Sequence, residues 1–292
     1  MTIVLAGATG DLGGRIARAL AARGGEVVAP VRPNTPAERL APLERVGVRA
    51  VPVRFDDTSA LAEVCRGATC VVSALNGLED TMLVQQGHLL DAAVAAGVPR
   101  FVPSDFALDF TRTVPGDNRN LDLRRRFMAR VDAAPIAATS ILNGAFADLL
   151  TGQAPIVLCG IRRVLHWGDA DQPYDFTARD DVAAYAAAAA LDRETPRILR
   201  IAGDTVTPRM LAATMSGITG RRYRTLRAGS IGTLSAIIAV AKRFGRDDAV
   251  FPAWQGMQYL RDMAGGRGRL DPLDNDRYPM RWTTVREVLA AA

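Results

Sequence analysis

Lysine is almost absent from this sequence of 292 residues, in which Lys242 is the only one and arginine carries nearly all of the positive charge. Cysteine and histidine are also scarce, with 3 and 2 residues, and no Cys-x-x-Cys pair occurs. The net charge of +5 comes from arginines that alternate with acidic residues, which is typical of a solvated surface. The sequence therefore predicts no structural zinc site and no nucleic-acid partner.

Long apolar runs are missing as well, since the two longest, residues 182–191 and 234–241, fall short of the roughly 18 residues of a membrane span. The sequence begins with an apolar strand pattern in place of the basic leader of a secretion signal. We therefore expect no membrane partner and a cytoplasmic location. With 49% hydrophobic and 23% charged residues, the composition is that of a globular protein.

Short β-rich runs alternate with helical patterns over the first half of the sequence, which is typical of a parallel sheet wound with crossover helices. We therefore predict an α/β fold with a doubly wound parallel sheet. The predicted strands are residues 2–6, 26–31, 49–53, 70–74, 100–103 and 138–142. The predicted helices, whose apolar residues recur every three or four positions, are residues 12–22, 59–65, 82–96 and 121–132.

The alternation loosens in the second half, where an alanine-rich helix is predicted over residues 179–191. Thr177, followed three residues later by Asp180, marks its start with a capping-box pattern. Alanine on most faces permits close approach to a sheet, so we expect this helix to return to the core of the first half. The other predicted elements are strands over 155–159 and 197–202, a helix over 208–219 and a short helix over 283–289. Residues 231–243 form an apolar segment, and residues 251–263 follow as a segment to which no element type is assigned.

The strongest local signal is the segment from Thr2 to Gly13, in which an apolar strand turns through three spaced glycines into an amphipathic helix. Gly7 permits the tight turn, Gly10 lets the backbone approach a pyrophosphate, and Gly13 lets the helix pack closely on the sheet. The first N–H groups of the helix then face the phosphates. The G-x-x-G-x-x-G spacing predicts a dinucleotide site of the short-chain dehydrogenase type.

Arg32 follows the second predicted strand, where a protein that binds NAD carries an acidic residue on the ribose 2′-hydroxyl. An arginine there can bind a 2′-phosphate, with Arg39 as a second contact, so the sequence favours NADP(H) over NAD. The alternative is that Arg32 is a solvated residue at a strand end. After the third strand, Asp56 either accepts a hydrogen bond from the adenine amino group or caps the next helix.

The fourth and fifth predicted strands end in small and polar residues at the carboxyl edge of the sheet, where a cofactor meets a parallel sheet. Phe106, after the fifth strand, either flanks a nicotinamide ring or packs in the core. The residues predicted at this edge are Ser73, Ala74, Leu75, Asn76, Ser104 and Phe106.

Two further segments, residues 97–106 and residues 143–146, complete a pattern that begins with the glycine loop and Arg32. With these segments the sequence resembles the NmrA-like and isoflavone-reductase-like atypical short-chain dehydrogenases/reductases. The resemblance implies an NADP(H)-binding Rossmann domain over residues 1–150 and a smaller substrate lobe over 151–292, from which residues 177–202 return to the Rossmann domain. The resemblance extends, more loosely, over nearly the whole chain.

The resemblance also assigns cofactor contacts, which join those derived from the residues above. It implies that Thr9, Leu12 and Phe106 contact the cofactor, and the segment from residue 143 adds Asn143. The complete set of predicted NADP(H) contacts is Gly7, Thr9, Gly10, Asp11, Leu12, Gly13, Arg32, Arg39, Asp56, Ser73, Ala74, Leu75, Asn76, Ser104, Phe106 and Asn143.

The Tyr-x-x-x-Lys pair of typical short-chain dehydrogenases is missing from this sequence. Reductases that resemble isoflavone reductase place a lysine on the helix after the fifth strand, and Arg124 stands at the matching position. At 100° per residue, Arg124 lies in the apolar stripe of that helix and Arg126 points away from it. A buried arginine needs a partner, which is either a substrate or cofactor anion or an internal carboxylate such as Asp105 or Asp122.

His166 and Tyr174 join Arg124 as predicted catalytic residues, although such residues are more often structural side chains. Arginine keeps its proton, so if Arg124 is a ligand contact it binds a developing anion and does not exchange a proton. The first hypothesis is an NADPH-dependent reductase that transfers hydride to a hydrophobic, aromatic or polyketide-like small molecule. The alternative is an NADP(H)-sensing regulator without turnover. A homodimer or another protein partner is left open.

Overall fold

The computed structural model describes residues 1–245 and 248–292, and the chain divides into two compact units. Unit 1 comprises residues Met1–Asp105, Leu123–Ile141 and Val182–Leu199. Unit 2 comprises residues Phe106–Asp122, Leu142–Asp181 and Arg200–Ala292. The chain therefore passes between the two units more than once, and the segment that contains most of the alanine-rich helix belongs to unit 1.

Unit 1 contains a six-stranded sheet with the order β3-β2-β1-β4-β5-β6, in which every pair of neighbours is parallel. Successive strands are added toward one edge of the sheet from β1 to β3 and toward the other edge from β4 to β6. This order is that of a Rossmann-type doubly wound sheet, so the predicted fold class is confirmed. The strands are β1 (Thr2–Ala6), β2 (Glu26–Val31), β3 (Arg49–Pro52), β4 (Cys70–Ser73), β5 (Arg100–Val102) and β6 (Ala137–Ala138).

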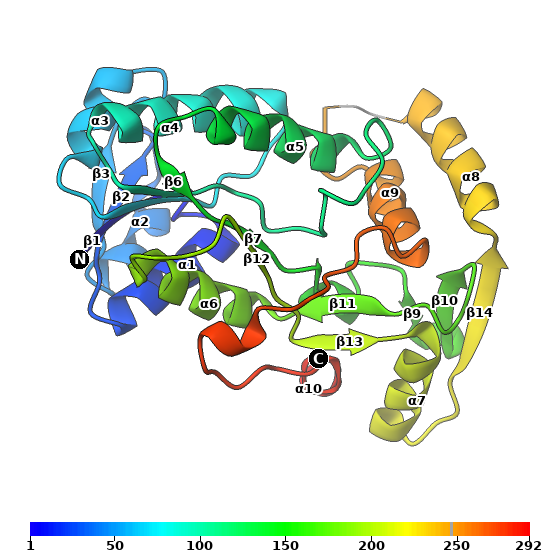
Figure 1. The fold of residues 1–292 in the computed structure, drawn as a ribbon. Helices are drawn as coiled ribbons and strands as arrows, with labels where there is room; N and C mark the ends of the chain where they lie inside the picture. Colours follow the sequence, from blue (N-terminus) through cyan, green and yellow to red (C-terminus); the bar gives the residue numbers. More distant parts are fainter. Residues whose placement is uncertain (246–247) are drawn as a thin grey trace. The chain divides into compact units, whose positions relative to one another are not determined.

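Helices cover both faces of this sheet, with α3, α4 and α5 on one face and α1 and α6 on the other (Figure 1). The predicted helix over 82–96 begins with a wider π-helical segment, η1 (Asp80–Gln85), before the regular helix starts. The helices are α1 (Asp11–Ala22), α2 (Ala37–Glu44), α3 (Thr58–Cys65), α4 (Gln86–Ala95), α5 (Arg119–Asp132) and α6 (Arg179–Leu191).

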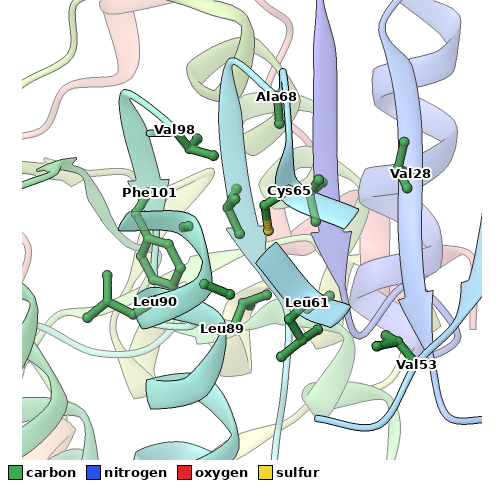
Figure 2. Close-up of a cluster of buried hydrophobic side chains, with 14 of the residues drawn as sticks. Val28, Val53, Leu61, Cys65, Ala68, Leu89, Leu90, Val98 and Phe101 are labelled. Carbon is green, nitrogen blue, oxygen red and sulfur yellow. The ribbon is translucent and has the colours of Figure 1, made fainter. Parts of the chain in front are cut away.

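Buried apolar side chains fill the space between the sheet and helices α3, α4 and α5. Leu61 and Cys65 from α3 meet Leu89 and Leu90 from α4, and Phe101 of β5 packs beside them (Figure 2). All five side chains are at most 1% exposed. Burial of such side chains contributes roughly 1.5–3 kcal/mol each, so this cluster holds the sheet and its carboxyl edge in a fixed shape.

The predicted strand over 138–142 is wrong as a single element, because the chain leaves the sheet edge after Thr139. The backbone N–H of Thr139 still donates to Phe101, at 3.0 Å, but that of Ser140 donates to Arg197, at 2.9 Å. The strand is thus divided into β6 in the six-stranded sheet and β7 (Ser140–Leu142), which pairs with β12 (Ile198–Arg200).

Asp57, and not Asp56, caps helix α3. Its carboxylate accepts a hydrogen bond from the backbone N–H of Ala60 at 2.9 Å. Asp56 lies on the surface, where the hydrogen bond from Arg54 lowers the pKa of its carboxyl. The capping interpretation of Asp56 is therefore wrong by one residue, and its contact with adenine stays a prediction.

Replacing Asp57 with alanine should lower the free energy of unfolding by about 1 kcal/mol, because a helix N-terminus loses its side-chain acceptor. Thermal or urea unfolding measures the change. Asp56→Ala is the matched control, and we expect it to leave stability unchanged since Asp56 is exposed and its ion pair with Arg54 is on the surface. Equal losses in the two variants would contradict the assignment of the cap.

Unit 2 contains two small three-stranded sheets, ordered β14-β10-β9 and β13-β11-β8. Within the described residues, no helix combines the length and apolar character needed to cross a membrane. The strands are β8 (Ala145–Phe146), β9 (Val157–Leu158), β10 (Arg163–Trp167), β11 (Tyr174–Thr177), β13 (Asp204–Val206) and β14 (Arg224–Gly229). The helices are η2 (Ala147–Thr151), η3 (Cys159–Ile161), α7 (Pro208–Thr219), α8 (Ile231–Phe244), α9 (Ala253–Ala264), η4 (Asn275–Arg277) and α10 (Val285–Ala290).

The predicted capping box at the start of α6 is wrong. The hydroxyl of Thr177 donates to the backbone carbonyl of Asn143 at 2.7 Å and does not accept from the helix. The N–H of Arg179 donates instead to Asp148, a residue 31 positions earlier in the chain, at 3.0 Å. The carboxylate of Asp148 in η2 thus accepts the hydrogen bond at the start of α6 that the sequence pattern assigned to the hydroxyl of Thr177.

Candidate dinucleotide-binding site

The glycine loop between β1 and α1 is closely packed against its own backbone and against the end of β4. Gly7 adopts a positive φ of 80°, and a Cβ there would lie 2.6 Å from the carbonyl oxygen of Ala74. A Cβ on Gly13 would lie 2.1 Å from the carbonyl oxygen of Gly7, which also accepts from the N–H of Gly10 at 2.9 Å. Glycine is therefore required at positions 7 and 13 by the fold of the loop.

The first turn of α1 is left without a side-chain cap. Its N-cap residue is Gly10, which offers no acceptor. The carboxylate of Asp11 is exposed and pairs with Arg15 one turn later at 2.8 Å. The positive end of the helix dipole is consequently open to an anion, the arrangement in which parallel α/β folds bind phosphate.

One arginine contacts this loop, and a second follows the strand next to β1. Arg39 of α2 donates to the carbonyl oxygen of Thr9 at 3.2 Å, which joins its guanidinium to the loop. Arg32 lies directly after β2, whose neighbour in the sheet is β1, and it is exposed. Among the described residues, no carboxylate forms an ion pair with Arg32 or Arg39. Two accessible positive charges thus lie where the sequence predicts a 2′-phosphate.

The ends of β4 and β5 are joined by Ser104. Its hydroxyl donates to the carbonyl oxygen of Leu75 at 2.6 Å, and its N–H donates to the buried side chain of Gln86 at 2.9 Å. Ser73 is fully buried, while Ala74 and Leu75 are half-buried and Asn76 is exposed. The structure therefore brings these predicted residues together at the carboxyl edge of the sheet in unit 1, along with the glycine loop.

Arg124 points from α5 into the interior of unit 1, with 6% of its surface exposed, whereas Arg126 is exposed and pairs with Glu79. The helical spacing thus predicted the orientation of both side chains. The charge of Arg124 acts on Asp105, one of the two carboxylates named as its partner. The other, Asp122, accepts from the N–H of Gly116 at 3.0 Å.

Four of the predicted site residues belong to unit 2. Phe106 is 6% exposed and Asn143 is fully buried. His166 is 4% exposed, and burial, followed by the positive charge of Arg227, lowers the pKa of its imidazole. Burial raises the pKa of Tyr174 to about 12. Near neutral pH the imidazole of His166 and the hydroxyl of Tyr174 are therefore both uncharged.

Sequence reasoning missed the surroundings of Asp105, namely Ser140, Arg197 and Asp132. The only local signal was the position of Asp105 directly after a predicted strand. Its hydrogen-bond partner Ser140 lies 35 residues away, on a strand that the sequence pattern placed in the main sheet. Arg197 lies still further along the chain and has no spacing that links it to Asp105.

Comparison with known protein families tests the predicted resemblance. The model of the NmrA-like family matches residues 1–251. The chain belongs to the NmrA-like family. The resemblance drawn from the glycine loop, Arg32 and the segments after β5 and β7 is therefore confirmed. The six-stranded parallel sheet of unit 1 agrees with the Rossmann domain that the resemblance implies.

Curated relatives of this NmrA-like protein include plant reductases. Pinoresinol reductase 1 of Arabidopsis thaliana is 30% identical over 208 residues, which cover 66% of this chain and 65% of the relative. The isoflavone reductase homolog IRL of Zea mays is 30% identical over 236 residues, 76% of this chain and 75% of the relative. The chain thus spans just under two thirds of the first of these relatives and three quarters of the second.

Among solved structures, leucoanthocyanidin reductase of Vitis vinifera in its complex with NADPH is similar over the whole length. The TM-score is 0.84 with 20% sequence identity, and the match covers 100% of this chain and 99% of the other. At this level of identity the likeness concerns the fold, which extends through both units of the NmrA-like chain.

Proposed function

We propose that this NmrA-like protein is an NADPH-dependent reductase that transfers hydride to a hydrophobic, aromatic or polyketide-like small molecule. The observation that carries the proposal is the glycine loop with its uncapped helix beside the exposed Arg32 and Arg39. Supporting it, the chain resembles pinoresinol reductase 1, and the similar leucoanthocyanidin reductase was solved with NADPH. A small-molecule substrate follows from the same relatives.

The residues of unit 1 fit an NADP(H) cofactor. A pyrophosphate can come close to the backbone only where no Cβ lies in the way. A Cβ on Gly10 would lie 3.2 Å from the carbonyl oxygen of Gly7. Gly10 is exposed, so the loop surface is open to a ligand there. Arg32 and Arg39 would bind the 2′-phosphate, and Ser104 with residues 73–76 would line the edge beyond the pyrophosphate.

When bound, NADPH supplies the hydride, and NADP⁺ remains while a solvent proton completes the reduced product. The protein binds and orients the cofactor and stabilises negative charge. We propose Arg124 for the last role, because a guanidinium donates hydrogen bonds and keeps its charge at every accessible pH. His166 and Tyr174, both neutral near pH 7, are proposed as hydrogen-bonding residues of the substrate site in unit 2.

Replacing Arg32 with alanine should weaken NADPH binding about 10- to 100-fold and leave NADH binding unchanged. The lost bonds to the 2′-phosphate are charge-assisted, and such bonds contribute roughly 1.5–3 kcal/mol. Calorimetric titration with NADPH, NADP⁺, NADH and NAD⁺ measures the difference. Arg45→Ala, an exposed arginine after α2, is the matched control. Equal affinity of the native protein for the NAD and NADP pairs would contradict the role of Arg32.

Turnover is tested by following NADPH oxidation with (+)-pinoresinol, trans-chalcone and 1,4-naphthoquinone as probes. We expect consumption of NADPH with at least one of them and a fall in kcat/KM for Arg32→Ala that matches its loss of affinity. Selective NADPH binding without oxidation in the presence of any probe would overturn the reductase and leave a dinucleotide-sensing protein.

A further inference from the structure

Strand β14 lies at an open edge of one of the two small sheets in unit 2. In the sheet β14-β10-β9 it pairs with β10 in parallel, with Arg224 opposite Arg163, and no strand in the described part of the chain pairs with its other side. None of its six residues is buried, and four are exposed, namely Arg224, Leu226, Arg227 and Ala228. Such an edge offers backbone N–H and C=O groups to another strand.

The backbone groups of β14 alternate between β10 and the free edge. The N–H of Arg224 donates to the carbonyl oxygen of Arg162 at 3.3 Å, on the β10 side. In a parallel ladder the N–H and C=O groups of one residue point to the same side, and those of the next residue point to the opposite side. The register is regular from Arg224 to Arg227, so the N–H groups of Thr225 and Arg227 point to the free edge.

Positive charge gathers at this edge without carboxylates to balance it. Residues 205–246 contain eight basic residues and neither aspartate nor glutamate. Arg209 pairs with Asp171 at 2.8 Å, at the start of α7. Within the described residues, no carboxylate forms an ion pair with the six arginines in or next to β10 and β14, which are Arg162, Arg163, Arg221, Arg222, Arg224 and Arg227. Positive charges on neighbouring residues repel one another, so acidic groups that bind here relieve this repulsion.

We propose that β14 is a docking site for an acidic, extended segment of a partner protein, which adds to the small sheet as a further strand. The backbone of the segment bonds to Thr225 and Arg227, and its carboxylates pair with the arginines beside them. The inference goes beyond the proposed reductase and does not depend on it, because none of these residues belongs to the dinucleotide site of unit 1.

The charges of β14 determine which partner fits. Charged side chains on an edge strand oppose pairing with strands in general, because the charge must be desolvated or must meet its like. A second copy of this chain that paired through β14 would bring arginines next to arginines. An acidic strand meets neither obstacle. The open backbone edge beside the arginines favours a protein segment over a nucleic acid or a lipid surface, since neither of these adds to a sheet.

Fluorescence anisotropy of the labelled peptide acetyl-EVEVEVE-amide, titrated with the full chain, tests the inference. We expect saturable binding in about 50 mM NaCl that weakens about tenfold in about 500 mM NaCl, since salt screens exposed charges. The peptides acetyl-KVKVKVK-amide and acetyl-EPEPEPE-amide should not bind, because the first has the wrong charge and the second cannot pair as a strand. Tight binding of single-stranded DNA or of phosphatidylserine vesicles with no binding of EVEVEVE would overturn the inference.

Charge reversal on β14 tests the contribution of the arginines. Arg224→Glu combined with Arg227→Glu should weaken binding of EVEVEVE at least about tenfold and leave the affinity for NADPH unchanged. The matched control is Arg23→Glu combined with Arg45→Glu, which changes the net charge equally at exposed positions of unit 1. Equal losses in the two double variants would show a general charge effect and contradict a site at β14.

Thr225→Pro tests whether the peptide adds as a strand. Proline removes the N–H that points to the free edge, and the ladder between β14 and β10 keeps its hydrogen bonds. We expect a folded protein, checked by circular dichroism and thermal unfolding, that binds EVEVEVE at least about tenfold more weakly. Thr225→Val, which keeps the N–H, should bind like the native protein. Native affinity in folded Thr225→Pro would overturn strand addition.

Discussion

Replacing Gly13 with alanine should abolish measurable NADPH binding and destabilise the protein by about 1–3 kcal/mol, the usual cost of overpacking. The new Cβ would lie 2.1 Å from the carbonyl oxygen of Gly7 and 2.7 Å from its carbonyl carbon. Both atoms are backbone, so no flexible side chain can move aside. Either α1 moves away from the sheet or the loop opens, and in both cases the phosphate-binding N–H groups lose their arrangement.

Gly14→Ala is the matched control for this variant. A Cβ at Gly14 would lie 3.4 Å from the carbonyl oxygen of Ala8, an ordinary contact, and alanine is the better helix former by roughly 0.5–1 kcal/mol. We expect this neighbour to bind NADPH normally and to unfold at an equal or higher temperature. Calorimetric titration and urea unfolding measure both variants. Native affinity in Gly13→Ala would contradict the placement of the cofactor on this loop.

Replacing Arg100 with methionine should have the largest effect on stability, a loss of about 3 kcal/mol, since charge-assisted hydrogen bonds to buried and half-buried acceptors disappear together. Arg100 lies in β5 and is 6% exposed. Its guanidinium donates to the carbonyl oxygen of Ala189 at 3.0 Å, to that of Asp192, and to the hydroxyl of Thr195 at 2.5 Å. It therefore satisfies a carbonyl in the last turn of α6 and the one just after the helix, and it complements the negative end of the helix dipole.

Two further variants separate the causes of this loss. Arg100→Lys keeps the positive charge at the helix end but cannot reach all three acceptors, so we expect about half of the destabilisation. Arg49→Met, at an exposed position on β3, should change stability by less than about 0.5 kcal/mol. Urea unfolding of the three proteins provides the comparison. A loss in Arg100→Met no larger than that in Arg49→Met would refute the capping role of Arg100.

Elements that are encoded locally could be predicted from the sequence. The turn from β1 into α1 follows from three glycines next to an apolar strand, and the alternation of strands and helices gave the Rossmann-type sheet. Helices α6 and α7 match their predicted bounds, 179–191 and 208–219, because the alanine-rich run of α6 and the adjacent cap Thr207 of α7 are local signals. The position of Arg124 on the buried face of α5 follows from the same helical period.

Features that depend on distant residues could not be predicted. The strand after α5 leaves the sheet at Ser140, whose backbone N–H donates to the carbonyl oxygen of Arg197. No sequence pattern near Ser140 indicates that partner. In the same way, the start of α6 is capped by the distant Asp148 and not by the nearby Thr177. The surroundings of Asp105 join residues 35 and more positions apart. Sequence patterns record short-range geometry, whereas these hydrogen bonds form only once the tertiary structure brings the partners together.

Transfer of deuterium from NADPH to product tests the central claim most directly. The protein is incubated with NADPH that carries deuterium at C4 of the nicotinamide, on each face in turn, and with (+)-pinoresinol or trans-chalcone. We expect mass spectrometry to find one deuterium on carbon in the reduced product, from one face of the nicotinamide only. Tight NADPH binding with no deuterium in any product would contradict the assignment of this NmrA-like protein as a reductase.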